Sequence, residues 1–178
     1  ASATTLIAPF LRDPSKPIML AIARPVRKKN LSALIDAFAS NPTLRNSCNL
    51  VILAGLRDDL ESGSEEQQQV QRELVERIDR HNLYGRVAYP KSHSRDDVQA
   101  LYALAARTRG VFVNPALTEP YGLTLVEAAA HGLPVVATKV GGPQDILADL
   151  EHGLLVDPRD VSEIGSAIER LVTDRHLW

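Results

Sequence analysis

Cysteine is nearly absent from this sequence, and so are long apolar runs and any large excess of charge of one sign. Cys48 is the only cysteine among 178 residues, which excludes an internal disulfide and a cysteine-rich zinc site. No run of about eighteen or more apolar residues occurs, so we expect no membrane-spanning helix. Lys and Arg number 20 against 22 Asp and Glu, without the basic excess of nucleic-acid-binding domains. These absences predict a cytoplasmic protein that binds neither a membrane nor a nucleic acid.

Several motifs that hold phosphates or catalyse reactions are also missing. Neither G-x-G-x-x-G nor G-x-x-x-x-G-K-[ST] occurs, which removes the usual phosphate cradles of dehydrogenases and P-loop NTPases. The G-x-S-x-G turn of α/β-hydrolases is absent as well. No D-x-D pair occurs, and neither His93 nor His131 has a second His or a Cys at metal-ligand spacing. We therefore expect no metal site.

The residues that are present indicate one globular domain. With 178 residues, of which 44% are apolar, the chain is long enough to bury a sizeable core. Residues 1–16 are expected to form a flexible leader or interdomain segment, and the region of residues 61–69 is also expected to be flexible. The folded domain is predicted over residues 17–173, with a short tail over residues 174–178.

Apolar runs alternate with helical patterns along the chain. Strands are predicted over residues 18–23, 50–54, 87–89, 110–114, 134–138 and 154–156. Helices are predicted over residues 31–38, 65–81, 96–107, 124–131 and 161–172, and from about Pro143. Runs that are apolar throughout indicate burial on both faces, as in a parallel sheet. The pattern predicts an α/β fold, a Rossmann-like parallel six-stranded sheet with helices on both faces.

Basic residues follow the first predicted strand, at the end of the sheet where such folds bind ligands. Arg24, Arg27, Lys28 and Lys29 come directly after that strand. Cations at this place suit an anionic ligand, most naturally a diphosphate. The alternative interpretation is a solvated basic loop without a special role. Asn30 comes next and is expected to cap the following helix.

The segment after the fourth strand contains a second candidate site. Gly122 permits close approach of the backbone, and the amides of Leu123 and Thr124 at a helix start suit a phosphate. Glu119 and Glu127 flank these amides. Thr124 and Glu127 fit a capping box, so a structural role for Glu127 stands beside a ligand-binding role. Glu119 has no such structural role and is a candidate for contact with sugar hydroxyls.

With seven residues between them, Glu119 and Glu127 resemble the E-x7-E element of retaining glycosyltransferases of the GT-B fold, glycosyltransferase family 4. Arg24 and Lys29 are similar to the basic pair of that family. Longer strings resemble the members that use UDP-glucose and fructose 6-phosphate, over about residues 17–173. These strings are residues 24–25, 28–30, 55–59, 87–91, 110–117, 128–134 and 153–158.

The resemblance implies a role for each matching residue in the C-terminal, nucleotide-sugar-binding domain of such an enzyme. Arg24 and Lys29 would bind the donor diphosphate and stabilise the departing charge. Glu119 would contact the transferred glucose, and Glu127 the ribose hydroxyls. The other implied donor-binding residues are Arg57, Tyr89 and Lys91 near the uracil, and Tyr121, Gly122, Leu123 and Thr124 near the distal phosphate.

The implied reaction transfers glucose from UDP-glucose to fructose 6-phosphate with retention, giving sucrose 6-phosphate and UDP, and requires no metal or other cofactor. The acceptor domain is expected to be missing from these residues, so the chain alone should bind UDP or UDP-glucose and not catalyse transfer. Other interpretations stay open. They are sucrose synthase or another hexosyltransferase of the family, a non-catalytic regulatory module of the same fold, and a sugar-nucleotide epimerase. The acceptor, the preference for UDP over ADP or GDP, and the oligomeric state also stay open.

Overall fold

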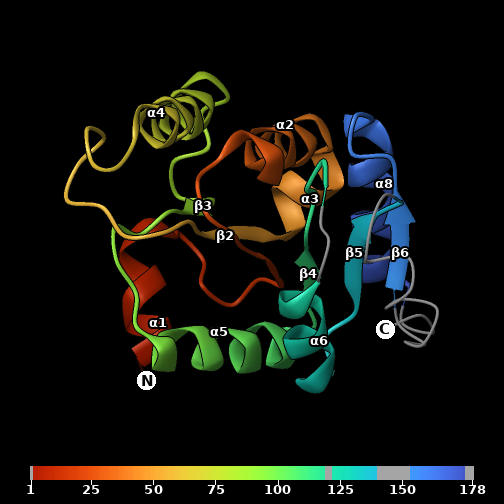
Figure 1. Ribbon diagram of the computed structural model, residues 1–178. Helices are drawn as coiled ribbons and strands as arrows, with labels where there is room; N and C mark the ends of the chain where they lie inside the picture. Colours follow the sequence, from red (N-terminus) through yellow and green to blue (C-terminus); the bar gives the residue numbers. More distant parts are fainter. Residues whose placement is uncertain (1, 119–121, 140–152, 175–178) are drawn as a thin grey trace.

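The computed structural model describes residues 2–118, 122–139 and 153–174, and a parallel β-sheet forms its centre (Figure 1). The strands are β1 (Ile18–Ile22), β2 (Asn49–Leu53), β3 (Val87–Ala88), β4 (Val111–Val113), β5 (Val135–Thr138) and β6 (Gly153–Val156). They lie in the order β3-β2-β1-β4-β5-β6, and each pair of neighbours is parallel. Every predicted apolar run forms a strand, which confirms the predicted fold class.

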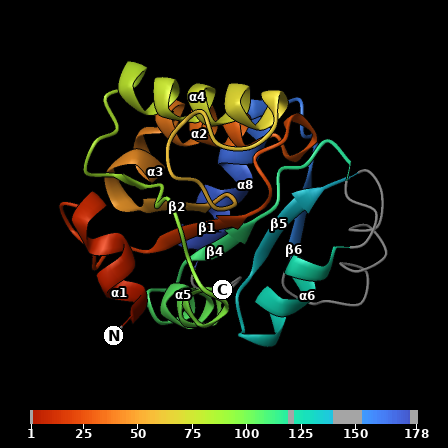
Figure 2. The ribbon, with the colours of Figure 1, turned by 60° about the vertical axis from the view of Figure 1, so that its left-hand side comes forward.

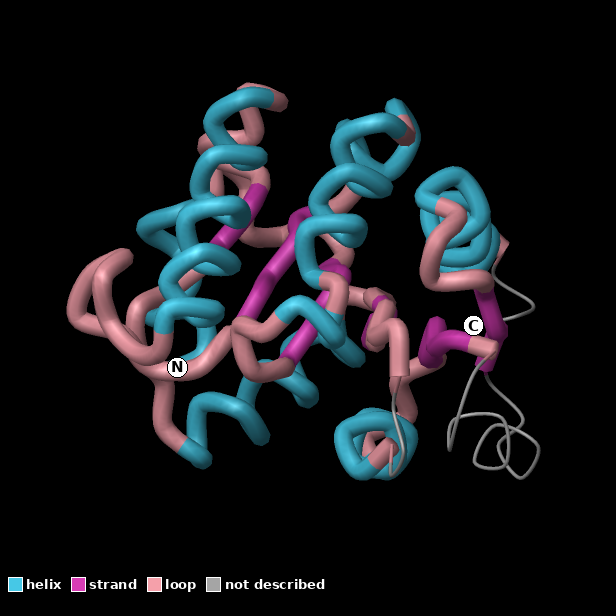
Figure 3. The backbone as a smooth tube through the Cα atoms, turned by 45° about the horizontal axis from the view of Figure 1, so that its top comes forward, coloured by secondary structure: helices cyan, strands magenta, loops and turns pink. Residues whose placement is uncertain are grey.

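Helices cover both faces of the sheet (Figures 2 and 3). One face carries α2 (Leu31–Ser40), α3 (Pro42–Ser47), α4 (Glu65–Arg80) and α8 (Val161–Thr173). The other face carries α1 (Ser2–Ile7), α5 (Arg95–Arg107) and α6 (Leu123–Ala130). Two short 3-10 turns are η1 (Ala8–Phe10) and η2 (Arg27–Lys29). Among these described helices, none combines the length and the apolar character that crossing a membrane requires.

Two apolar cores form because neighbouring side chains of a strand point to opposite faces. In β1, Met19 and Ala21 pack into the core under α2, α4 and α8. Ile18 and Leu20 pack into the core over α1, α5 and α6. All four side chains are buried, so β1 lies in the interior and reads as a continuous apolar run.

The N-terminal segment differs from the expectation of flexibility. Residues Ser2–Ile7 form α1, which packs against α5 and buries Ala3 and Ile7. Further along, the Arg12 amide donates to the Gly85 carbonyl at 2.9 Å, beside a bridge between Leu11 and Gly85. The prediction of a flexible segment is wrong here, because a few well-spaced apolar residues suffice to dock one short helix on a core that other parts of the chain provide.

Two further boundaries also differ from the predictions. No helix is predicted between residues 39 and 49, but α3 begins at Pro42, and the Asn41 side chain caps that helix by accepting from the Leu44 amide at 3.1 Å. The region of residues 61–69 is ordered from Glu65 onward, since a capping box at Ser64 starts α4. The helix predicted from Pro143 lies outside the described residues.

Protein contacts close the amino end of the sheet. Gly110 packs so closely on β1 that a Cβ atom there would lie 1.9 Å from the Ile18 carbonyl oxygen. The Thr108 hydroxyl accepts from the Ile18 amide at 3.1 Å and donates to the Ala105 carbonyl at 3.0 Å. These contacts join the start of β1 to the end of α5 and the start of β4.

Candidate functional site

The carboxyl end of the sheet carries a cavity of about 400 Å³. It opens beyond β1 and β4, which are neighbours in the sheet and are followed by helices on opposite faces. Doubly wound sheets bind ligands at such a switch point. The lining residues are Ile22, Ala23, Arg24, Lys29, Leu53, Gly55, His93, Asn114, Leu123 and Thr124. They come from several loops that are far apart in the sequence and meet here.

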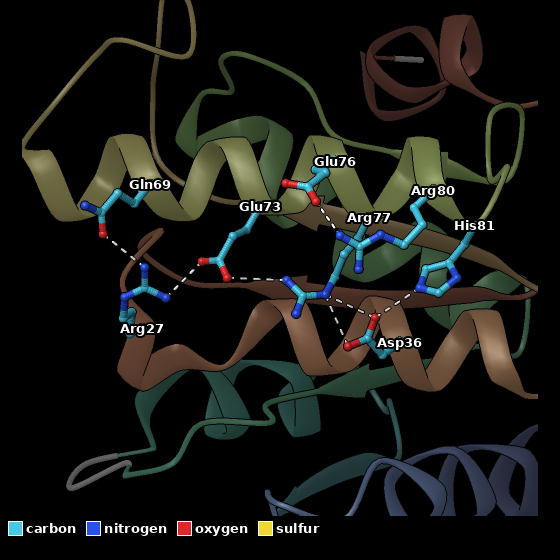
Figure 4. A network of polar contacts seen from close by, with 8 residues as sticks. All are labelled: Arg27, Asp36, Gln69, Glu73, Glu76, Arg77, Arg80 and His81. Atoms are coloured by element: carbon cyan, nitrogen blue, oxygen red, sulfur yellow. Dashed lines mark hydrogen bonds and ion pairs between the residues drawn. The ribbon is translucent and has the colours of Figure 1, made fainter.

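The four cations that follow β1 do not form one cluster. Arg24 and Lys29 line the cavity. Arg27 instead turns toward α4, where its guanidinium donates to Glu73 at 2.9 Å and to Gln69 at 3.0 Å (Figure 4). The structure therefore assigns two of the predicted cations to the cavity and gives a third a structural partner.

Helix α4 is joined to α2 by the rest of this network (Figure 4). The Nε of Arg77 donates to both carboxylate oxygens of Asp36, at 3.1 and 3.2 Å. His81 Nε2 lies 3.2 Å from the same carboxylate, and Arg77 also lies 3.5 Å from Glu73. Ion pairs and hydrogen bonds thus continue from Arg27 to His81 and connect the turn after β1 to the outer helical layer.

The start of α6 forms another part of the cavity wall. Gly122 precedes the helix with a φ of 64°, a left-handed conformation that favours glycine. Leu123 and Thr124 follow in the first turn, where amide groups have no acceptor within the helix, and both line the cavity. The predicted phosphate-binding amides are therefore beside the predicted cations. Glu119 and Tyr121 lie outside the described residues.

Glu127 does not take part in a capping box. Helix α6 begins at Leu123, so Thr124 is its second residue, and no side chain of the described residues caps the helix. The capping-box interpretation of Glu127 is therefore wrong, and its ligand-binding role stays a prediction. Burial, followed by the charge of Glu127 and a hydrogen bond to it, raises the pKa of Tyr102. Glu127 belongs to a second cavity of about 660 Å³, lined also by Leu56, His93, Ser94, Arg95, Val98 and Gln99.

His93 lines both cavities, so they are adjacent at this residue. Its Nδ1 is buried and has no hydrogen-bond partner in the part of the chain that the structure describes. Burial lowers the pKa of His93, while the charge of Asp97 opposes that shift. From the sequence, His93 could be assessed only as a metal ligand. No local pattern shows that its loop lies between two cavities.

Arg57 and Tyr89 hold together the loop that follows β3. The Arg57 guanidinium lies 3.7 Å from the centre of the Tyr89 ring and donates to the carbonyls of Tyr89 at 3.2 Å and Pro90 at 3.3 Å. The Arg57 amide donates to the Lys91 carbonyl at 2.9 Å. Burial lowers the pKa of Arg57 and raises that of Tyr89. The structure brings Arg57, Tyr89 and Lys91 together, but none of them lines either cavity.

A parallel, doubly wound sheet with cations and helix amides around one cavity defines an α/β domain suited to a ligand that carries phosphate. Comparison with known proteins gives the family. The chain belongs to the glycosyl transferases group 1 family, whose model matches residues 3–177.

Relatives within this family include sucrose-phosphate synthases. The chain is 51% identical over 169 residues to that of Spinacia oleracea, covering 95% of this chain and 16% of the relative. The protein of Zea mays matches equally, so the chain spans about a sixth of the length of these relatives. The solved sucrose-phosphate synthase of Thermosynechococcus elongatus has a TM-score of 0.77 and 31% identity, over 93% of this chain and 38% of that chain. Anabaena HepE, solved with UDP and glucose, has a TM-score of 0.73 and 25% identity, over 92% of this chain and 40% of that chain.

Proposed function

We propose that residues 17–173 are the donor-binding domain of a retaining glycosyltransferase and that the donor is UDP-glucose. The observation that carries the proposal is that Arg24, Lys29 and the start of α6 line one cavity at the switch point of the sheet. The sucrose-phosphate synthases among the relatives, and a structural neighbour solved with UDP and glucose, support this choice of donor.

Arg24 and Lys29 bind the diphosphate, and the amides of Leu123 and Thr124 bind its distal phosphate. Hydrogen bonds from a charged donor to phosphate oxygens are about twice as strong as neutral ones. The helix start adds a partial positive charge on the same side. This arrangement stabilises the charge that develops on the departing UDP, and no metal takes part in it.

Glu127 and the loop after β3 bind the nucleoside. The Glu127 carboxylate is an acceptor only, which matches the donor hydroxyls of a ribose. It lines the second cavity, which adjoins the first at His93, so we expect the ribose in the second cavity beside the diphosphate in the first. Arg57 holds the backbone of residues 89–91 in place for the uracil.

The reaction of the whole enzyme is transfer of glucose to fructose 6-phosphate, giving sucrose 6-phosphate in the cytoplasm. Glu119 contacts the transferred glucose, and Tyr121 lies beside the distal phosphate. The chain covers about a sixth of the length of the sucrose-phosphate synthases it matches, so we place the fructose 6-phosphate site in a part of such an enzyme that these residues do not match. The chain by itself therefore binds the donor without transferring its glucose.

Titration calorimetry with UDP tests this proposal. Arg24→Ala should weaken UDP binding by about tenfold to a hundredfold, since a hydrogen bond to a charged group contributes about 1.5–3 kcal/mol. Lys28→Ala is the matched control, because Lys28 is an exposed cation of the same turn that lines neither cavity. Its UDP affinity should change less than about twofold. Equal losses in both variants, or no binding of UDP by the unaltered chain, would contradict the proposal.

An assay of UDP release separates donor binding from complete catalysis. With UDP-glucose and fructose 6-phosphate, the chain alone should release UDP no faster than a buffer control. Rapid turnover would show that the acceptor site lies within these residues. Competition by ADP and GDP in the same titration measures the preference for the base.

A further inference from the structure

Asn30 occupies an unusual place between η2 and α2. Its φ and ψ are 60° and 30°, a left-handed conformation that asparagine tolerates better than most residues. Its amide donates to the Arg27 carbonyl at 3.0 Å, and its carbonyl accepts from the Ala33 amide at 3.1 Å. The backbone of Asn30 thus ends one helical turn and begins the next, directly after the cavity residue Lys29.

The Asn30 side chain does not cap α2, contrary to the expectation from the sequence. Its Nδ2 donates instead to two distant carbonyls, that of Pro115 at 3.0 Å and that of Pro158 at 2.8 Å. Pro115 follows β4 and Pro158 follows β6. One side-chain amide therefore joins the loops that follow β1, β4 and β6. Because it makes these bonds, the side chain does not cap α2, as an asparagine at this position usually would.

A second contact strengthens the same junction. The Leu117 amide donates to the Lys28 carbonyl at 2.8 Å, so the turn after β1 is bonded to the loop after β4 at two places. Arg27 of the same turn is bonded to Glu73 and Gln69 on α4 (Figure 4). The turn that carries Lys29 is thereby bonded both to the loop after β4 and to α4.

Lys29 and Asn114 come from the two segments that Asn30 joins, and both line the 400 Å³ cavity. We propose that Asn30 is a positioning residue, whose side-chain amide holds Lys29 in place against the loop after β4 and so sets the geometry of the diphosphate site. That the ligand is a diphosphate rests on the proposed function. The hydrogen bonds of Asn30 are contacts within the protein and do not depend on the ligand.

The test is a double-mutant cycle on UDP affinity. Asn30→Asp keeps the size and the left-handed backbone but loses both N–H donors and places a carboxylate against two carbonyl oxygens. It should weaken UDP binding about tenfold by calorimetry, and by less than about twofold when Lys29→Ala is already present, because contacting residues are not additive. Asn30→Gly also lacks the side-chain amide, and glycine adopts the left-handed backbone without strain. It should weaken UDP binding to the same extent, and it replaces Asn30→Asp in the test if that variant does not fold.

Arg80→Ala is the control, since Arg80 pairs only with Glu76 among the described residues, on the outside of α4. It should leave the UDP affinity unchanged. An equal loss from Asn30→Asp with and without Lys29→Ala, or no loss at all, overturns the proposal, because Asn30 would then not act through Lys29.

Hydrogen exchange of the Leu117 amide gives a readout without a ligand. Its exchange should become at least about tenfold faster in both Asn30 variants, because that amide bonds to the turn that Asn30 fixes. Unchanged protection would overturn the positioning role even if UDP did not bind. Faster exchange in a chain that fails to bind UDP would instead contradict the proposed ligand.

Discussion

At the amino end of the sheet buried polar groups have protein partners, whereas at the carboxyl end several have none among the described residues. The Ile18 amide is paired with Thr108, and the Asn49 side chain donates to the Asp13 carbonyl at 2.7 Å. At the carboxyl end, the structure describes four buried side-chain atoms without a hydrogen-bond partner. These are Arg57 Nε, Tyr89 Oη, His93 Nδ1 and Thr138 Oγ1, from positions that end or follow β2, β3 and β5.

This difference separates the part of the fold that provides stability from the part that is available to a ligand. A buried polar group without a partner costs about 1–3 kcal/mol, so such groups are rare in native proteins. Here they occur at the end of the sheet where both cavities lie. Changes at the amino end should therefore reduce stability, while some changes at the carboxyl end should raise it.

The largest effect on stability is expected from Gly110→Ala, at the amino end. The added Cβ would lie 1.9 Å from the Ile18 carbonyl oxygen, and β1 cannot move away because strands flank it on both sides. The free energy of unfolding should fall by about 3 kcal/mol, measured by urea denaturation. Gly165→Ala in α8 is the matched control. Its Cβ meets nothing closer than 3.5 Å, so stability should stay equal or rise by up to about 1 kcal/mol. A stable Gly110→Ala protein would refute the tight packing of β4 on β1.

A smaller loss is expected from Thr108→Val. This substitution keeps the shape of the side chain but removes the hydroxyl that accepts from Ile18 and donates to Ala105. The Ile18 amide is left without that acceptor, so the free energy of unfolding should fall by about 1–2 kcal/mol. The same denaturation experiment measures it. Stability equal to that of the unaltered chain would mean that these two hydrogen bonds contribute nothing.

Thr138→Val is the same substitution at the carboxyl end, and its effect should have the opposite sign. The Thr138 hydroxyl is buried and has no hydrogen-bond partner among the described residues. Burying this hydroxyl costs free energy that no hydrogen bond to a described residue offsets, so replacing it with a methyl group should stabilise the fold. We expect the free energy of unfolding to rise by about 1 kcal/mol. A loss of stability as large as that of Thr108→Val would remove the distinction between the two ends.

Several site residues could be predicted because their chemistry is local. A glycine before a helix, Gly122, indicates free amides in the residues that follow it, and the structure puts those residues, Leu123 and Thr124, on the cavity wall. Arg24 and Lys29 could be chosen from the basic turn only through the family resemblance. Nothing local distinguishes Arg27, which is bonded to residues about forty positions away on α4.

Other predictions failed where a distant partner competes with a local one. Asn30 is a good helix cap by type, but its amide is better placed for the carbonyls of Pro115 and Pro158. Thr124 and Glu127 match the capping pattern, yet α6 starts one residue earlier, at Leu123, after a left-handed glycine. Residues 1–16 show no strong helical pattern, yet they contain α1. This short helix is stabilised by packing on a core that is formed mainly by other parts of the chain, so its own sequence needs few apolar residues.

The sequence alone determined the parallel sheet and which loops follow its strands at the end where the cavity lies. Its apolar runs are continuous because the strands are buried on both faces, and that burial is the dominant favourable term in folding. Only the tertiary structure decided which polar side chains pair with each other and which line a cavity. Hydrogen bonds and ion pairs act over a few ångströms, and the partners of Arg27 and Asn30 are brought within that range only when segments far apart in the sequence meet.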